Sequence, residues 1–143
     1  MNTNEEMLQF LYKSASMSVD TTARMISKTD DSRLRRELTS LMNGYKSFAE
    51  DAKRGLRAHG LAPEDNKNMT KLMTNVGIAV NTMLDSTPSH IAEIMINGTN
   101  MGLIKMNKHL NRNKSCPSQT AEKCRKLMDF ERDSIAKLEG YLS

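Results

Sequence analysis

The polar residues best placed to do chemistry in this sequence of 143 residues lie in the middle of apolar helical stripes. Glu131 is the only acid on such a stripe, and it needs hydrogen-bond donors because burying an unpartnered carboxylate is costly. Hydroxyl groups near the midpoints of other stripes can supply them. We therefore predict a hydrogen-bonded polar layer at the centre of the molecule, formed by Ser18, Tyr45, Thr99 and Glu131. The alternative is that Glu131 lies at a margin between helices and reaches water.

The histidines and cysteines have simpler explanations than metal binding or catalysis. His90 and Glu93 are three residues apart at the start of a predicted helix, where capping and interaction with the helix dipole are the commoner roles. Cys116 and Cys124 are eight residues apart, a spacing that fits neither a zinc site nor a disulfide framework. No histidine is evidently placed to activate Cys124 as a nucleophile. We therefore predict that the protein is not an enzyme and that it has no metal site and no cofactor.

Repeating apolar residues indicate that helices carry these side chains. Leu34, Leu38, Leu41 and Tyr45, for example, are spaced by threes and fours, as expected for the buried face of a helix. Four long helices and a shorter third one are predicted, at residues 4–27, 31–59, 66–84, 88–111 and 118–142. The shorter helix would return the chain along the bundle, so that the second and fourth helices run parallel. The predicted fold is therefore all-α: a single domain, residues 1–143, that forms a four-helix bundle with a fifth, shorter helix in the crossover.

Residues typical of helix ends support these boundaries. Asp30 or Asp31 can cap the second helix, and Thr87, which precedes a proline, can cap the fourth. Gly60 suits the position just after the second helix, because glycine readily adopts the left-handed conformation found there. Ser118 is predicted to cap the last helix.

Two glycines, Gly98 and Gly102, lie four residues apart within the predicted helix 88–111. Each costs roughly 1 kcal/mol relative to alanine inside a helix, so a structural reason is expected. Both lie beside the apolar stripe of an unusually wide buried face. We favour the close approach of another helix, either the segment 66–84 or a helix of a second copy of the chain. The alternative is that the glycines leave room for methionine side chains to repack.

The helix order and two segments of the sequence resemble the ferritin-like superfamily. These segments, SHIAEIMINGTNMGLIKMNKHLN at 89–111 and KLMDFERDSIAKLEGYL at 126–142, look like a group of small bacterial bundle proteins with no established activity. The resemblance implies a central site for two metal ions, which requires a Glu-x-x-His pair on two helices. Thr87, Met106 and Leu56 stand three residues before the three histidines, so the motif is missing. We therefore interpret the centre as a degenerate metal site, in which the polar layer replaces the ligands.

Charge and hydropathy restrict the expected partners. The formal net charge is +4, but no stacking aromatic residues accompany the basic ones, so nucleic acid is not expected as a partner. No run of about 18 apolar residues is present, so no membrane span is expected. The N-terminal residues MNTNEEMLQF are acidic where a signal peptide would be basic, which predicts a cytoplasmic protein.

Two functions remain open from the sequence. The first is a non-enzymatic helical bundle that acts through protein–protein contacts and forms a homodimer, with any other partner unidentified. The second is a binding protein for a small ligand or metal in a remodelled bundle centre, where the polar layer and the glycines would form a cavity. A role in binding nucleic acid ranks third.

Overall fold

The computed structural model describes residues 2–64, 80 and 83–143. Within these ranges the chain forms four helices and no strand, which confirms the all-α class. The helices are α1 (Thr3–Lys28), α2 (Ser32–Ala58), α4 (Pro88–Arg112) and α5 (Ser118–Glu139). Three of the predicted helices, at 4–27, 31–59 and 88–111, agree with the structure to within about one residue at each end. The shorter helix predicted at 66–84 falls mainly on residues outside the described ranges.

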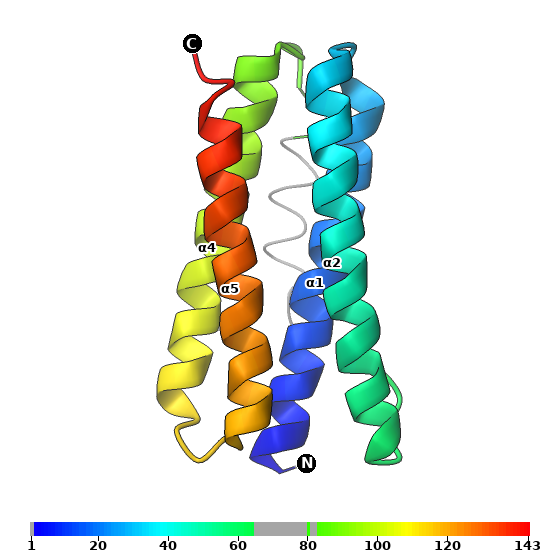
Figure 1. The fold of residues 1–143 in the computed structure, drawn as a ribbon, viewed down its shortest axis with the longest axis vertical. Coiled ribbons are helices and arrows are strands. Elements are labelled where there is room, and N and C mark those ends of the chain that lie inside the picture. The colour runs from blue at the N-terminus through cyan, green and yellow to red at the C-terminus, as the bar shows by residue number, and fades with distance from the viewer. Residues whose placement is uncertain (1, 65–79, 81–82) are drawn as a thin grey trace.

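The four helices form two antiparallel hairpins that lie side by side (Figure 1). Helices α1 and α2 make the first hairpin, and α4 and α5 make the second. Helix α2 points in the same direction as α4, which is the parallel arrangement predicted for the second and fourth helices. As a result, residues 59–87 connect an end of α2 to the start of α4 at the opposite end of the bundle.

The N-terminal ends of α2 and α4 are fixed by the predicted caps. The Asp31 side chain accepts a hydrogen bond of 2.8 Å from the backbone N–H of Leu34. The Thr87 hydroxyl accepts one of 3.3 Å from the N–H of His90, and Pro88 follows as the first helical residue. Both contacts satisfy backbone donors that have no partner inside the helix.

The C-terminal end of α2 has the glycine that was predicted for it. Gly60 has a φ of +73°, and its N–H donates to the carbonyl of Arg57 over 2.9 Å. The N–H of Leu61 donates to the carbonyl of Leu56, also over 2.9 Å. These two bonds form a Schellman motif, which requires the left-handed conformation at the glycine.

Both ends of α5 differ from the prediction. Ser118 is the first helical residue and not the cap; Pro117 precedes the helix, and no side chain caps it. Pro117 stands at the cap position with φ −55° and ψ 141°, and its side chain has no oxygen that could accept from the first N–H groups of the helix. At the other end, Leu142 was assigned to the buried stripe but lies beyond Glu139, where α5 ends, and is exposed. The stripe continues in the sequence after the helix has stopped.

A polar clamp holds the residues that follow α2 against α1. The side chain of Gln9 is buried; its amide donates to the carbonyl of Ala62, and its oxygen accepts from the N–H of Glu64, each over 2.9 Å. The ammonium group of Lys13 contacts the Glu64 carboxylate, also at 2.9 Å. The clamp fixes where the chain leaves the first hairpin, and no sequence pattern indicated it.

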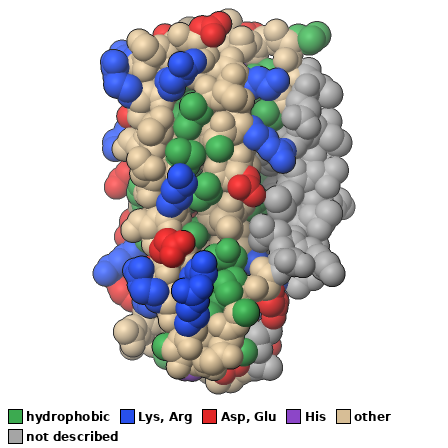
Figure 2. Space-filling model, turned by 90° about the vertical axis from the view of Figure 1, so that its right-hand side faces the viewer, with side chains coloured by type: hydrophobic (Ala, Val, Ile, Leu, Met, Phe, Trp, Pro, Cys, Tyr) green, Lys and Arg blue, Asp and Glu red, His purple; other side chains and the backbone are tan. Residues whose placement is uncertain are grey.

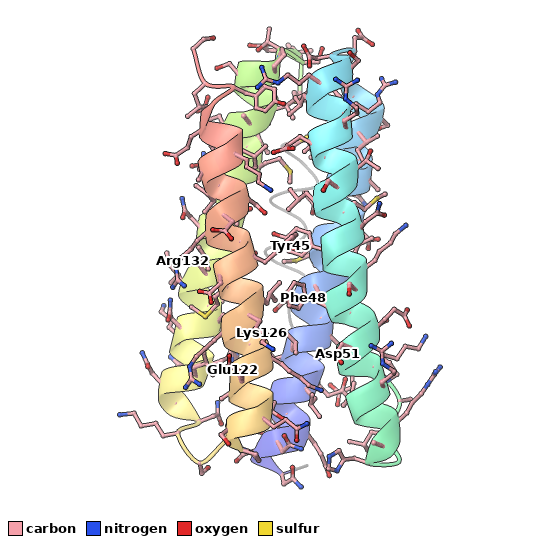
Figure 3. The ribbon with its side chains drawn as sticks, viewed as in Figure 1. Tyr45, Phe48, Asp51, Glu122, Lys126 and Arg132 are labelled. Atoms are coloured by element: carbon pink, nitrogen blue, oxygen red, sulfur yellow. The ribbon has the colours of Figure 1, made fainter. Side chains whose placement is uncertain are left out.

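Aromatic side chains join the two hairpins where α2 faces α5. Figure 3 shows Tyr45 and Phe48 on α2, on the side that faces α5. The ring of Phe130 on α5 lies 5.3 Å from that of Tyr45 and 5.5 Å from that of Phe48, between ring centroids. A Cβ atom added at Gly44 would lie 2.3 Å from Cζ of Phe130. The close approach of Phe130 to α2 is therefore possible only because Gly44 has no side chain. Gly55, where a Cβ atom would lie 3.1 Å from Cδ2 of Leu8, allows a similar but looser contact with α1.

The two glycines of α4 have much more space among the described residues. A Cβ atom at Gly98 would meet no atom within 4 Å, and one at Gly102 would meet only Oε2 of Glu131, at an ordinary 3.6 Å. No described helix therefore packs closely against this flank of α4. The neighbours proposed from the sequence were the segment 66–84 and a second copy of the chain. The close approach at Gly98 and Gly102 stays a prediction.

One face of the described surface carries dispersed charge. On the face that α1 and α2 present in Figure 2, basic side chains are separated by acidic and uncharged ones and form no continuous stripe. None of the four described helices combines the length and the apolar character needed to cross a membrane.

Alanine at Gly44 and at Gly98 should have opposite effects on stability. Alanine favours a helix over glycine by about 1 kcal/mol, so Gly98→Ala should raise the free energy of unfolding by up to that amount. At Gly44 the new methyl group must displace the Phe130 ring, and overpacking of this kind costs about 1–3 kcal/mol. Urea unfolding followed by circular dichroism should find Gly44→Ala about 2 kcal/mol less stable than Gly98→Ala. Equal stabilisation by both changes would contradict the packing at Gly44.

Candidate functional site

A hydrogen bond between Tyr45 and Glu131 lies at the centre of the bundle. The Tyr45 hydroxyl, on α2, donates to Oε2 of Glu131, on α5, over 3.0 Å. Tyr45 is 1% exposed and Glu131 is 5% exposed. Glu131 is thus buried and does not lie at an exposed margin between helices. Glu131 is buried because it lies on the apolar stripe of α5. Tyr45 lies on the apolar stripe of α2, so its hydroxyl faces Glu131 in the core.

Burial changes the acidity of both groups in this pair. It raises the pKa of Glu131 to about 7, although the hydrogen bond from Tyr45 and the charge of Arg132 act in the opposite direction. The pKa of Tyr45 is raised well above its ordinary value, first by burial and then by the neighbouring Glu131 carboxylate. The Tyr45 phenol therefore keeps its proton and acts as a donor at neutral pH, where Glu131 is present in both its ionised and its protonated form.

The predicted hydroxyl residues lie beside this pair on α1 and α4. Thr99 donates its hydroxyl hydrogen to the carbonyl of Met95 over 2.7 Å. Ser18 donates to the carbonyl of Ser14 over 3.0 Å, and Thr22 donates to the carbonyl of Ser18 over 2.6 Å. Each is a bond to the preceding turn of the same helix, which is a common arrangement for serine and threonine inside helices. The oxygen atoms of these hydroxyls keep lone pairs that can accept further hydrogen bonds.

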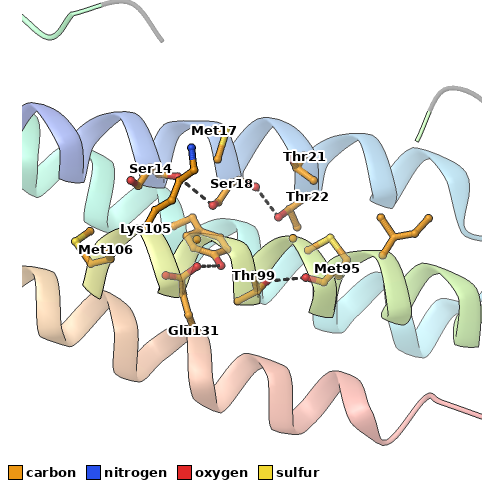
Figure 4. A pocket seen from close by; sticks show the side chains of 14 residues that line it. Ser14, Met17, Ser18, Thr21, Thr22, Met95, Thr99, Lys105, Met106 and Glu131 are labelled. Carbon is orange, nitrogen blue, oxygen red and sulfur yellow. Dashed lines mark hydrogen bonds between the residues drawn. The ribbon is translucent and has the colours of Figure 1, made fainter. Parts of the chain in front are cut away.

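These residues surround a cavity between α1 and α4 (Figure 4). Its free volume is about 40 Å³, enough for about three water molecules. Ser14, Thr21 and Gly98 on its wall are partly exposed, so the cavity reaches the surface. The structure brings all four residues of the predicted polar layer to this one cavity, namely Ser18, Tyr45, Thr99 and Glu131.

Gly98 and Gly102 form part of the cavity wall. The absence of side chains at these positions leaves the space open, as the second hypothesis from the sequence required. A side chain longer than a methyl group at Gly102 would extend toward the Glu131 carboxylate, which lies 3.6 Å from the position of its Cβ atom. The glycines therefore contribute to the shape of the site through the volume that they leave empty.

Lys105 was not predicted as a site residue, yet it lines the same cavity. A signal was present, because it follows Gly102 by three residues and Gly98 by seven, and such spacings place residues on one face of a helix. Figure 4 shows that its ammonium group extends toward α1. Glu131 forms no ion pair with any residue in the described ranges, so its charge is not neutralised by Lys105.

The histidines and cysteines considered as candidate site residues do not line this cavity. His90 and Glu93 are 3.8 Å apart at the start of α4, with both side chains well exposed. Cys124 is fully buried, and burial raises the pKa of its thiol to about 12, so the reactive thiolate is scarce at neutral pH. Across residues 2–64, 80 and 83–143, no three His, Cys, Asp or Glu side chains come together as metal ligands.

The raised pKa of Glu131 predicts how stability depends on pH. The folded protein holds this proton up to about pH 7, whereas an unfolded chain releases it near the ordinary carboxyl value of 4.5. The folded state thus binds more protons between these values, and its stability falls as the pH rises through them. We expect this one group to lower the free energy of unfolding by up to about 3 kcal/mol between pH 4 and pH 8.

Glu131→Gln should remove this part of the pH dependence, because the amide cannot ionise. Denaturant unfolding at several pH values would measure it, with Glu93→Gln as a control at an exposed acid of the same charge. If Glu131→Gln and the wild type lose stability in parallel as the pH rises, Glu131 does not titrate in the buried state described here.

Comparisons with known proteins found no match to this chain. No protein-family model matches the chain, and searches of the curated proteins and of the solved structures likewise find no match. The four helices and their order are therefore established by the structure alone, and the resemblance to ferritin-like proteins stays an expectation from the sequence.

Proposed function

We propose that this chain is a non-enzymatic helical bundle that binds a small molecule in the cavity between α1 and α4. The observation that supports this function is the buried Tyr45–Glu131 pair, which faces a space that Gly98 and Gly102 leave open. An apolar side chain that filled this space would stabilise the bundle more than a cavity with a buried acid does. Apolar pockets with a few convergent polar groups and a perturbed pKa are typical of binding sites.

We further propose that the bundle is a degenerate member of the ferritin-like superfamily. The parallel direction of α2 and α4 supports this, since ferritin-like bundles have one long connection between their second and third core helices. The polar layer lies at mid-height in the bundle, where such proteins hold metal ions. In this proposal, one carboxylate and several hydroxyls have replaced the metal ligands.

Native mass spectrometry can test the binding function. Protein purified gently from its expression host should carry an added mass of a small molecule. Gly98→Leu should lose this mass, because the leucine side chain would occupy the cavity, whereas Gly98→Ala should keep most of it. Where the natural ligand dissociates during purification, a fragment panel at tenfold its Kd should stabilise the wild type by about 1.4 kcal/mol. Absence of both bound mass and stabilisation would reject the proposal.

A second candidate function is self-association through the outer face of α4. Met101 and Ile104 on this face are 41% and 55% exposed, and they are neighbours because they lie three residues apart on the helix. Adjacent exposed apolar side chains are more typical of a contact surface than isolated ones are. This observation supports the homodimer that the sequence suggested.

Sedimentation over a dilution series would test self-association. We expect a dimer whose dissociation constant rises at least tenfold in Ile104→Lys, which places a charge in the contact. Asn111→Lys is the control, since it adds the same charge to an exposed position of α4 that lies about two turns away from Ile104. A monomer at every concentration would reject this second function and leave the cavity unaffected.

A further inference from the structure

The inner polar groups of the cavity offer hydrogen-bond acceptors and few donors. A hydroxyl group has a single hydrogen, and in Ser18, Thr22 and Thr99 a backbone carbonyl is within reach to accept it. The hydroxyls of Ser18 and Thr99 also hydrogen-bond the Tyr45 hydroxyl, so in either case the hydrogen has an acceptor within the protein. The hydrogen of Tyr45 is donated to Glu131. What these four groups can present to a ligand is therefore the lone pairs of their oxygen atoms. A ligand that matches them must bring its own hydrogens.

The carboxylate of Glu131 likewise requires a partner that donates hydrogen bonds. Its Oε2 accepts the bond from Tyr45, whereas Oε1 forms no hydrogen bond with a described residue. Within the described ranges Arg132 is the one cation that lowers its pKa, but this side chain is 54% exposed and contacts Asp129 at 3.3 Å. The described residues therefore leave the buried negative charge largely uncompensated when Glu131 ionises. A positively charged ligand would supply the missing partner.

We propose that the ligand of this cavity is a small primary ammonium ion, held by the carboxylate of Glu131 and the hydroxyl oxygens of Thr99 and Ser18. This inference rests on the binding function proposed above. An ammonium group carries three N–H donors and no acceptor, which is the complement of the acceptors described. Hydrogen bonds between an ammonium ion and a carboxylate are also about twice as strong as neutral ones.

The apolar part of the wall favours an organic cation over a metal ion. Met17, Met95 and Met106 line the cavity together with the oxygen atoms. An alkyl group can pack against these flexible thioether side chains. A hard metal cation instead prefers to be surrounded by about six oxygen ligands, which a partly apolar wall does not provide. The mixture of oxygen acceptors and methionines thus fits the two ends of an alkylammonium ion.

Lys105 restricts the charge of the ligand. Its ammonium group lies on the part of the wall that faces α1 (Figure 4), and it would repel a second positive charge there. We therefore expect a monoamine to bind more tightly than a diamine. For the same reason Lys105→Met should increase the affinity for a monoamine, whereas a merely structural role for Lys105 would leave the affinity unchanged or lower it.

Binding should be coupled to the ionisation of Glu131. Besides Glu131 on α5, the titratable groups that line the cavity among residues 2–64, 80 and 83–143 are Tyr45 on α2 and Lys105 on α4, and α1 contributes none. The exposed Arg132 acts on Glu131 from the same helix. Since burial raises the pKa of Glu131 to about 7, an ammonium ion must displace a proton from it at pH 6 but not at pH 8. The affinity should therefore be about tenfold weaker at pH 6.

Titration calorimetry with ethylammonium chloride tests the ligand class. Ethanol, sodium acetate and potassium chloride serve as the neutral, anionic and metal-ion comparisons. We expect ethylammonium to bind at pH 8 and to release a proton on binding at pH 6, as seen by comparing buffers of different ionisation enthalpy. Glu131→Gln should weaken binding at least tenfold. Thr99→Val, which keeps the shape but removes the oxygen, should weaken it about fivefold and remains informative should Glu131→Gln fold poorly.

The outcomes separate the ligand class from the binding function. Binding of ethanol or acetate but not of ethylammonium would overturn the ammonium proposal and leave the cavity as a binding site. Potassium binding as tightly as ethylammonium would identify a metal-ion site instead and also overturn it. If no probe binds and native mass spectrometry finds no added mass, the proposed function itself fails.

Discussion

The hydrogen bond between Tyr45 and Glu131 is the constraint on which the centre of this bundle depends. It joins α2 of one hairpin to α5 of the other, and both side chains are almost completely buried. A carboxyl group in such a position disfavours its own charged form, so its surroundings must either hold it neutral or provide donors. The described helices provide one donor, the Tyr45 hydroxyl, and Glu131 also lies on the wall of a cavity. The hydroxyls, the glycines and the free volume all surround this single acid.

Glycine has opposite effects on the two sides of the bundle. Where α2 faces α5, Gly44 allows the Phe130 ring to fill the space, and the two hairpins are joined by aromatic packing. Where α4 faces α1, Gly98 and Gly102 stand opposite serine and threonine side chains, which are too short to fill the same space. The side that packs tightly can hold the hairpins together, so the other side can keep a cavity. This difference gives the bundle an asymmetric interior.

The sequence predicted the features that depend on local spacing. The described helices and the caps at Asp31, Thr87 and Gly60 follow from short-range rules, because each involves residues within one or two turns. The polar layer was also predictable, since residues near the midpoints of helices of similar length meet at one level of a bundle. The close contact at Gly44 and the clamp formed by Gln9 were not, because they depend on which helix faces which. The cap at Ser118 was wrong because Pro117 takes its place, and the stripe alone could not show that α5 ends before Leu142.

The hydrogen bonds that the hydroxyl groups already make determine which kind of ligand the cavity prefers. A serine or threonine that faced the cavity with its hydrogen free could donate to a ligand or accept from one, and the site would then have little preference. Here the hydrogens of Ser18, Thr22 and Thr99 have acceptors within the protein: the backbone carbonyl one turn earlier, and for Ser18 and Thr99 also the Tyr45 hydroxyl. The bond to the carbonyl forms within a single helix and needs no neighbouring helix. The preference for a donor ligand is therefore fixed by local helix geometry, while the strength of binding is set by the charge of Glu131, and the same burial that makes this charge unfavourable in the empty bundle strengthens its attraction for a cation.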